Sequence, residues 1–305
     1  MDHGRLFSFR PLSPPGSADQ YRLIRSWIQA CDDEHAACKL SKSSSGFLPT
    51  RLLDVSDVSQ LKIVSSRAVR LLGSAPVAYI ALSYCWGKGP FLYVTTLGNI
   101  EARARGFEES ALPRTIRDAI AVTRQLQVRY IWVDALCILQ GQTPEAVRDC
   151  QRELQHMCDV YRCAHLTIAT ASAASVADGI FNPYSVSSAG FNIKLSSRNS
   201  LYDGIVRAGD VAGVNSIEEP LYKRAWTLQE RLLSRRYLVF NRDQVRWECQ
   251  TTECGERPQK WHHIGTPRRL PRTLLSAKDR QLWPVLTAHN EQTAPSSAAS
   301  SCRPL

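Results

Sequence analysis

The sequence predicts an α/β fold in which a parallel sheet is flanked by helices and extended by an antiparallel hairpin near the C-terminal end. The first observation is that short apolar stretches alternate with longer segments of helical periodicity over residues 78–172. The second is that these apolar stretches are nearly continuous, as expected of strands that are buried on both faces. Strand, helix, strand, helix and strand in this order predict parallel strands joined by crossover helices.

Five segments make up this alternation. The expected strands are 78–84, 130–138 and 165–172. The helix expected over 112–126 contains Pro113, a residue suited to a helix start, and the helix expected over 144–164 carries a long apolar stripe.

The flanking segments add further elements. Residues 20–39 place Leu23, Trp27 and Cys31 at roughly helical spacing, whereas residues 50–73 are typical of short extended pieces. On the C-terminal side we expect a helix over 222–233 and a hairpin whose strands are 236–240 and 244–249.

Composition favours a globular protein without a membrane span. Hydrophobic residues make up 44% of the 305 residues, enough for a sizeable core, but no apolar run reaches the length of about 18 that a spanning helix needs. The N-terminus lacks the apolar core of a secretory signal. The ten cysteines show no framework spacing, which favours reduced thiols. We therefore expect a cytoplasmic location, with the nucleus as the alternative.

The net charge of +10 is concentrated in two segments. Residues 222–246 hold seven Lys/Arg against two Asp/Glu, and residues 255–305 hold eight against three. Such segments could meet nucleic acid, anionic lipid or a phosphate-bearing ligand. A solvated face and a solvated tail are the commoner interpretation of charge runs. Because no groove-reading motif accompanies the charge, the sequence favours protein partners or self-association over nucleic acid.

Polar side chains follow the expected strands. In open α/β sheets, ligands bind outside the carboxyl ends of the strands. The loop Ser83-Tyr84-Cys85-Trp86-Gly87 follows the first strand, Asp134 comes late in the second, and Ser172 follows the third. Asp134 could instead hold backbone amides or an arginine such as Arg224, and the two aromatic residues could simply plug the end of the sheet. Cys85 lacks the sequence context of a papain-like nucleophile.

Glu153 lies beside the apolar stripe of its helix and could lean toward this crevice. A solvent-facing glutamate is the commoner arrangement on an amphipathic helix.

Two segments carry residues of the kinds that bind metals. Cys31-x3-His35-x2-Cys38 offers three ligands, and Cys249-x4-Cys254 followed by His262-His263 offers up to four. Neither matches a common zinc spacing, so we predict no metal site. The chain also has no glycine-rich phosphate loop of a standard nucleotide-binding fold.

Several collinear blocks resemble the heterokaryon incompatibility (HET) domain of filamentous fungi. The blocks are YIALSYCWG at 79–87, LPRTIRDAI at 112–120, YIWVDALCILQ at 130–140, the spaced residues from Glu153 to Ala164, LTIATAS at 166–172, GIF at 179–181, and RAWTLQERLLSRR with the strand and WEC that follow it at 224–249. The spaced residues of 27–38 and LPTRLLDV at 48–55 are similar to the leader of that family.

The resemblance implies a module of non-self recognition whose activation triggers programmed cell death when incompatible fungal cells fuse. That family is in turn thought to be distantly similar to Toll/interleukin-receptor (TIR) domains, which have a flavodoxin-like parallel sheet. Some TIR domains cleave NAD with a helix-borne glutamate. The resemblance therefore implies NAD as a candidate substrate, with no bound cofactor.

By this analogy, Glu153 would stabilise the oxocarbenium-like ribose, with Asp134 as the second catalytic carboxylate. The ligand-binding residues would be Ser83, which hydrogen-bonds ribose together with Asp134, the stacking residues Tyr84 and Trp86, Gly87 in their loop, and Arg224 at the pyrophosphate.

The expected domain organisation has three parts: a leader over 1–47 with one helix, a HET domain over 48–254, and a basic, disordered tail over 255–305. The alternative function is a non-enzymatic signalling module that acts by homotypic or partner assembly. An enzyme needs Glu153 and the loop of residues 83–87 to converge on one pocket, whereas an assembly module would tolerate the loss of Glu153.

Overall fold

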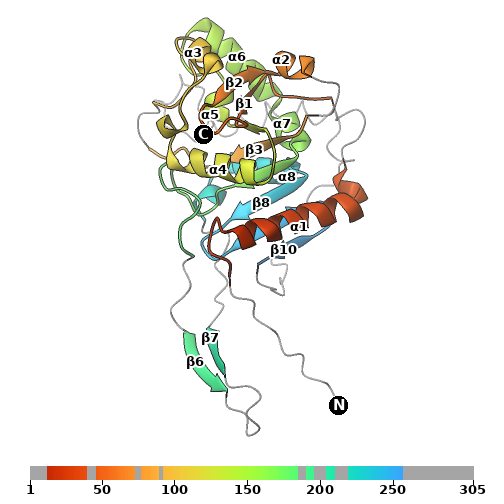
Figure 1. The fold of residues 1–305 in the computed structure, drawn as a ribbon. Helices are drawn as coiled ribbons and strands as arrows, with labels where there is room; N and C mark the ends of the chain where they lie inside the picture. Colours follow the sequence, from red (N-terminus) through yellow and green to blue (C-terminus); the bar gives the residue numbers. More distant parts are fainter. Residues whose placement is uncertain are drawn as a thin grey trace.

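The computed structural model describes residues 12–39, 46–72, 77–88, 92–184, 190–195, 204–209 and 219–256. Its centre is an eight-stranded mixed sheet with strand order β10-β9-β8-β5-β3-β4-β1-β2 (Figure 1). A separate two-stranded sheet pairs β6 (Gly190–Leu195) with β7 (Gly204–Gly209). Within the described residues, none of the helices has both the length and the apolar character to cross a membrane.

Four strands form the parallel centre of the sheet. Strand β3 (Tyr79–Ser83) pairs on one side with β4 (Tyr130–Trp132) and on the other with β5 (Leu166–Ala169), which pairs with β8 (Arg236–Phe240). Every residue of these four strands is buried, which explains their continuous apolar pattern. The prediction of a parallel α/β sheet is therefore confirmed.

Antiparallel strands complete both edges of the sheet. On one side, β9 (Val245–Cys249) and β10 (Glu253–Gly255) follow β8 and confirm the expected hairpin. On the other side, β1 (Arg51–Asp54) and β2 (Lys62–Ser65) form a second antiparallel pair, with β1 beside β4. The sheet is thus mixed, and less purely parallel than the sequence predicted.

Some of the helices start at a residue whose side chain caps them. The first, α1 (Ala18–Glu34), is capped by the Ser17 side chain, and the Thr143 side chain caps α6 (Pro144–Gln155), which has proline in its first turn. Helix α4 (Arg114–Gln125) buries one face that includes Ile116, Ala119 and Ile120. The remaining α-helices are α3 (Ile100–Arg105), α7 (Met157–Cys163) and α8 (Ala225–Leu233) together with the two short helices described next.

Two sequence predictions of local structure were wrong, and a third was confirmed only in part. Residues 130–138 do not form one strand, because β4 ends at Trp132 and the short helix α5 (Asp134–Cys137) follows, with Asp134 Oδ1 accepting a hydrogen bond of 2.7 Å from the Ala135 amide. Residues 144–164 form α6 and α7 rather than one helix, because the backbone of His156 leaves the helical conformation. This residue ends α6 and precedes α7. Within 50–73, the structure contains extended pieces at 51–54 and 62–65, as expected, but the Ser65 side chain caps a helix, α2 (Ser66–Leu71), that was not expected.

Helix α1 packs on the sheet beside β9 (Figure 1). Ile24 and Cys31 of α1 are fully buried and share one hydrophobic core with Ile80 of β3 and Trp247 of β9. Burial of this kind stabilises a helix far more than its intrinsic propensity does. The segment expected to be a leader is therefore part of the same core as the sheet, while the division of the chain into three domains stays a prediction.

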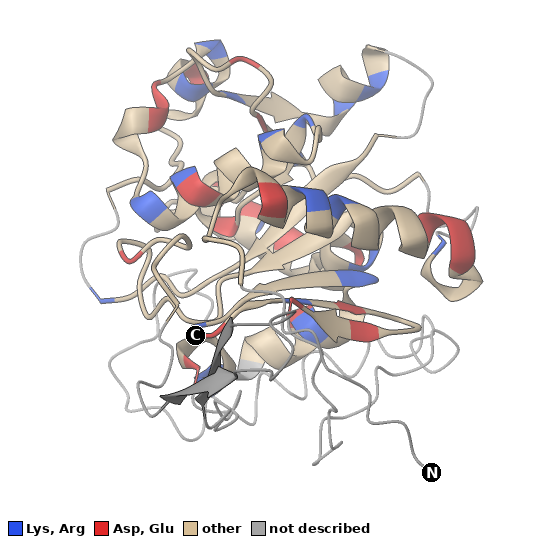
Figure 2. Ribbon diagram, turned by 60° about the horizontal axis from the view of Figure 1, so that its bottom comes forward, with Lys and Arg blue, Asp and Glu red and all other residues tan. Residues whose placement is uncertain are grey.

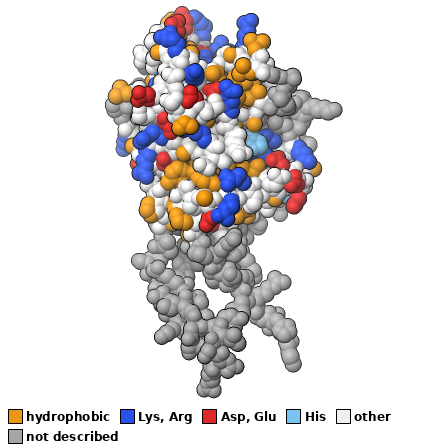
Figure 3. All heavy atoms as spheres, viewed as in Figure 1, with side chains coloured by type: hydrophobic (Ala, Val, Ile, Leu, Met, Phe, Trp, Pro, Cys, Tyr) orange, Lys and Arg blue, Asp and Glu red, His pale blue; other side chains and the backbone are white. Residues whose placement is uncertain are grey.

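The basic segment 222–246 is not a solvated face. Arg235 and Arg236 are buried, and Arg231 donates to both carboxylate oxygens of Glu248 at 2.8 Å. Positive and negative residues are interspersed along the elements and over the surface in view (Figures 2 and 3). Much of the positive charge in this segment thus takes part in internal ion pairs and hydrogen bonds. The second basic segment, 255–305, lies almost entirely outside the described residues.

Candidate functional site at the carboxyl ends of β3 and β5

The polar side chains that follow β3 meet groups from α5 and α8. The chain leaves β3, forms β4 on one side of it, and returns to form β5 on the other side. This change of direction creates a switch point, which is where open α/β sheets bind ligands. The strand order thus places the end of β3 at the position where a ligand site is expected.

Ser83 and Glu230 form the centre of the site. Ser83 is the last residue of β3, and its Oγ donates a hydrogen bond to Oε2 of Glu230 on α8. Burial raises the pKa of Glu230 to about 7, while the hydrogen bond from Ser83, the charge of Arg224 and a hydrogen bond from Tyr161 act in the opposite direction. A carboxyl group with this pKa can both accept and release a proton near neutral pH.

Asp134 is the second carboxylate of the site. Its Oδ2 accepts a hydrogen bond of 2.9 Å from the indole Nε1 of Trp86, and the hydroxyl group of Tyr84 lies near enough to lower the pKa of this carboxyl group. Burial raises the pKa of Asp134, although the hydrogen bonds from Trp86 and from the Ala135 amide and the nearby Tyr84 hydroxyl oppose the shift. Its negative charge also contributes to the raised pKa of Glu230. Asp134 thus accepts a hydrogen bond from a backbone amide, which is the structural role that the sequence analysis gave as an alternative. It also lies beside both aromatic residues of the loop.

Arg224 supplies a positive charge to this cluster. Its Nη1 donates a hydrogen bond of 2.6 Å to the carbonyl oxygen of Tyr84. The same guanidinium lowers the pKa of Glu230, of Asp134 and of Cys85 relative to what burial alone would give. For Cys85 burial prevails and raises the pKa of the thiol, so this residue is not an activated nucleophile.

Gly87 is required by the backbone at the end of the loop. Its φ is +85°, and a Cβ atom at this position would lie 2.6 Å from Cβ of Ser175. Tight packing of two chain segments therefore accounts for this glycine.

Glu153 lies away from these groups. Its side chain is only 1% exposed, so it does not face solvent as amphipathic glutamates usually do. Oε1 accepts a hydrogen bond from Thr50 Oγ1 and lies 3.7 Å from Nε of Arg152. The structure thus brings together Ser83, Tyr84, Trp86, Asp134 and Arg224, whereas the contacts it gives Glu153 are with other residues. The catalytic role of Glu153 stays a prediction.

Sequence reasoning missed Glu230. The signal was present in the helix AWTLQERLL, because Glu230 follows Trp226 by four residues and precedes the buried Leu233 by three. A glutamate on the apolar face of a short helix is a sign of a buried, hydrogen-bonded carboxyl group.

The fold and this cluster define an α/β protein with paired carboxyl groups at the switch point of its sheet. Residues 79–230 match the family model of the Heterokaryon incompatibility protein (HET), and the chain therefore carries a HET domain. The match begins at β3 and ends at Glu230, so it contains every residue of the site. No curated protein and no solved structure shows a significant match to this chain.

Proposed function

We propose that the chain is a cell-death effector of fungal non-self recognition that cleaves NAD or a related nucleotide at the switch point of its sheet. Its HET domain supports the incompatibility-related function. The observation that carries the proposed chemistry is the position of Glu230, which contacts Ser83 at the end of β3 and whose pKa is raised by burial to about 7, beside a second carboxylate and an arginine. Perturbed carboxyl pairs of this kind cluster at functional sites.

The order of the four parallel strands supports this proposal. Numbered along the chain, they run 2-1-3-4 across the sheet, which is the start of the flavodoxin-like order. The switch point of that order is a nucleotide-binding position in other α/β proteins. We therefore infer a TIR-like arrangement in which the nucleotide approaches the ends of β3 and β5.

In the proposed reaction, the bond between ribose C1′ and the nicotinamide nitrogen breaks, and its electron pair leaves with nicotinamide. Glu230 in its ionised form stabilises the oxocarbenium-like ribose and then accepts a proton from the water that attacks C1′. The products are nicotinamide, ADP-ribose and one proton. Asp134 and Ser83 hydrogen-bond the ribose, and Arg224 faces the pyrophosphate.

The test compares Glu230→Gln with Glu153→Gln in the purified full chain. Each protein is incubated with NAD, and the release of nicotinamide is followed by liquid chromatography. We expect wild type and Glu153→Gln to release nicotinamide and Glu230→Gln to lose at least about 100-fold in rate. Circular dichroism and thermal unfolding of each variant exclude a simple loss of folding.

Two results would contradict this assignment. Loss of activity only in Glu153→Gln would move the catalytic carboxylate to the residue that the sequence analysis favoured. Absence of nicotinamide release from all three proteins, combined with cell death on inducible expression of each in a fungal host, would favour the non-enzymatic assembly module.

A further inference from the structure

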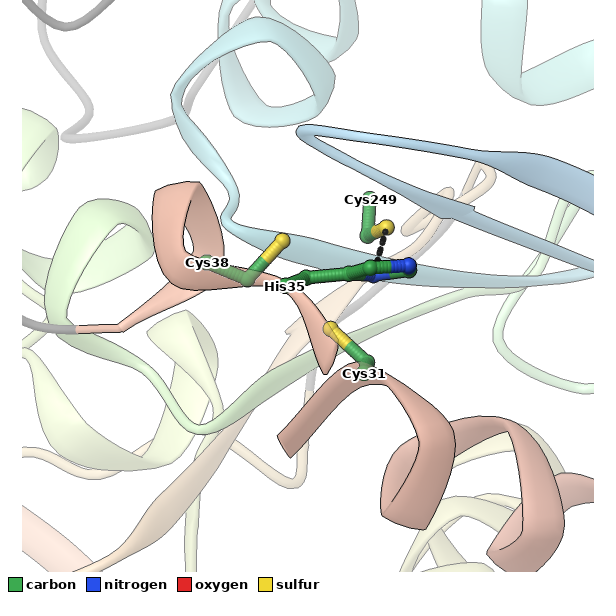
Figure 4. A group of neighbouring side chains, drawn as sticks. All are labelled: Cys31, His35, Cys38 and Cys249. Atoms are coloured by element: carbon green, nitrogen blue, oxygen red, sulfur yellow. Dashed lines mark hydrogen bonds between the residues drawn. The ribbon is translucent and has the colours of Figure 1, made fainter. Parts of the chain in front are cut away.

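Three cysteines and one histidine converge between α1 and the edge of the sheet. Cys31, His35, Cys38 and Cys249 each offer one ligand atom, and these four atoms all lie within 4.8 Å of one another. Figure 4 shows the three sulfur atoms and the imidazole ring grouped around a common space. The Nδ1 atom of His35 lies 3.3 Å from Sγ of Cys249.

Two distant parts of the chain deliver these side chains. Cys31 is in the last turn of α1, His35 caps that helix, and Cys38 ends the 3-10 helix η1 (Ala36–Cys38). Cys249 is the last residue of β9, and α1 packs beside this strand. All three cysteines are buried free thiols, while His35 is partly exposed.

This donor set has the chemistry of a structural zinc site. Zinc prefers four tetrahedral ligands in such sites, and three cysteines with one histidine are among its common sets. Zn–S bonds of about 2.3 Å in a tetrahedron place the sulfur atoms about 3.8 Å apart. The four donor atoms are close enough that small side-chain movements reach this spacing.

We propose that Cys31, His35, Cys38 and Cys249 bind one Zn²⁺ ion as a closed structural site that fastens the N-terminal helix to the sheet. Hard cations such as Mg²⁺ and Ca²⁺ are excluded because they require oxygen ligands. Softer sulfur and imidazole donors in a tetrahedral arrangement favour zinc.

The surroundings of the four residues suit zinc-bound thiolates. The backbone amides of Thr251 and Thr252 lie 3.5 and 3.3 Å from Sγ of Cys249 and donate to it. Nε of Arg236 donates to Sγ of Cys31 at 3.3 Å. Such outer hydrogen bonds orient metal ligands and stabilise their charge.

A positive charge lies beside the proposed site. Zinc with three thiolates and a neutral imidazole has a net charge of −1, and the buried guanidinium of Arg236 lies against this group. Asp32 pairs with the other side of the same guanidinium and holds it in place. Arg236 therefore serves both as a counter-charge for the site and as a link between α1 and β8.

The sequence predicts no metal site when the two segments with candidate ligands are considered separately. Neither segment matches a zinc spacing alone, because the set combines three residues of the first segment with one residue of the second. Cys254, the other cysteine of the second segment, is not part of the group. His262 and His263 lie outside the described residues.

The experiment measures zinc in the full chain, purified under reducing conditions and without a histidine tag, by atomic emission spectroscopy. We expect about one zinc per chain in wild type. Cys31→Ser, Cys38→Ser and Cys249→Ser should each retain less than about a tenth of this content, whereas the matched control Cys254→Ser should keep it. For the histidine, His35→Ala should lose zinc and His35→Cys should keep it, because a fourth thiolate can replace the imidazole.

A second measurement uses wild type alone, so its result does not depend on whether the variants fold. Wild type refolded with Co²⁺ in place of zinc should show thiolate-to-cobalt charge-transfer absorption and the intense visible bands of tetrahedral cobalt. A metal-free wild type with weak octahedral cobalt bands would overturn the proposal. So would equal zinc loss in Cys254→Ser, or a disulfide between any two of the three cysteines in the reduced, metal-supplemented protein by mass spectrometry.

Discussion

Ser83, the last residue of β3, donates a hydrogen bond to the carboxylate of Glu230 on α8, a residue 147 positions further along the chain. The burial of Glu230 makes the free energy of unfolding depend on pH. Burial raises the folded-state pKa of Glu230 to about 7 from 4.5. The unfolded chain therefore binds fewer protons than the folded chain between these values, so Glu230 lowers stability as pH rises from 4.5 to 7.

We expect Glu230→Gln to remove this contribution, which amounts to roughly 3 kcal/mol across the window. Urea unfolding at several pH values should show a difference between wild type and variant that changes steadily from pH 4.5 to 7 and is flat above it. The free energies of the two proteins must be compared with each other, because His165 also makes stability depend on pH. Burial lowers the pKa of His165 to about 4, so this residue raises stability as pH rises, equally in both proteins. Glu145→Gln, at an exposed position of α6, is the matched control substitution.

The second prediction concerns the indole of Trp86. Trp86→Phe removes the donor to Oδ2 of Asp134 and leaves this buried oxygen with fewer partners. We expect the free energy of unfolding at neutral pH to fall by about 1–3 kcal/mol. Trp27→Phe on the partly exposed face of α1 is the control. A loss for Trp86→Phe no larger than that of the control would show that the hydrogen bond contributes nothing net.

The third prediction concerns Gly87 and its left-handed backbone. Gly87→Ala adds a methyl group 2.6 Å from Cβ of Ser175 at a φ of +85°. Strain and overlap together should lower the free energy of unfolding by about 1–3 kcal/mol. Gly98→Ala is a matched control, since its nearest contact is Thr96 Oγ1 at 3.7 Å. Thermal unfolding of the two variants side by side decides the matter, and equal melting temperatures would refute the prediction.

The fourth prediction concerns Arg235, whose guanidinium is buried. Its Nη1 donates to the Cys38 carbonyl at 2.7 Å and its Nη2 to the Ala164 carbonyl at 3.0 Å. Lysine has a single ammonium group and cannot reproduce this fork. Arg235→Lys should therefore destabilise the protein by about 1–3 kcal/mol in urea unfolding. Arg148→Lys, at an exposed position of α6, should change stability by less than about 0.5 kcal/mol.

The sequence predicted the parallel centre of the sheet because its strands are buried on both faces and its helices are amphipathic. It predicted β4 too long, because the chain turns into a short helix at Asp134, whose Oδ1 accepts a hydrogen bond from the next amide, and apolar runs do not reveal such a turn. The β1–β2 pair was missed as a sheet edge for a related reason. Each of its strands is only four residues long, and so short a segment does not show enough alternation of apolar and polar residues to distinguish a paired strand from a loop.

The loop after β3 could be predicted as part of the candidate site from its position at the end of a buried strand. Periodicity did not favour Glu230 over Glu153, since each lies on or beside the apolar face of its helix, and the structure shows both at least partly buried. What separates them is which neighbour each helix brings to its carboxylate, Ser83 in one case and Thr50 in the other. Contacts between residues about 100 or more positions apart are set by the packing of whole elements.

The limits of the family match have a practical consequence for transplanting this domain. A fragment of residues 79–230 keeps β3, β4 and β5 but lacks β8, the neighbour of β5, and β1, the neighbour of β4. Both sides of the remaining sheet would present unpaired backbone groups along buried, apolar strands, which is a template for aggregation. A portable unit must therefore carry its flanking strands on both sides, and chimeras joined at the edges of the conserved block should be insoluble.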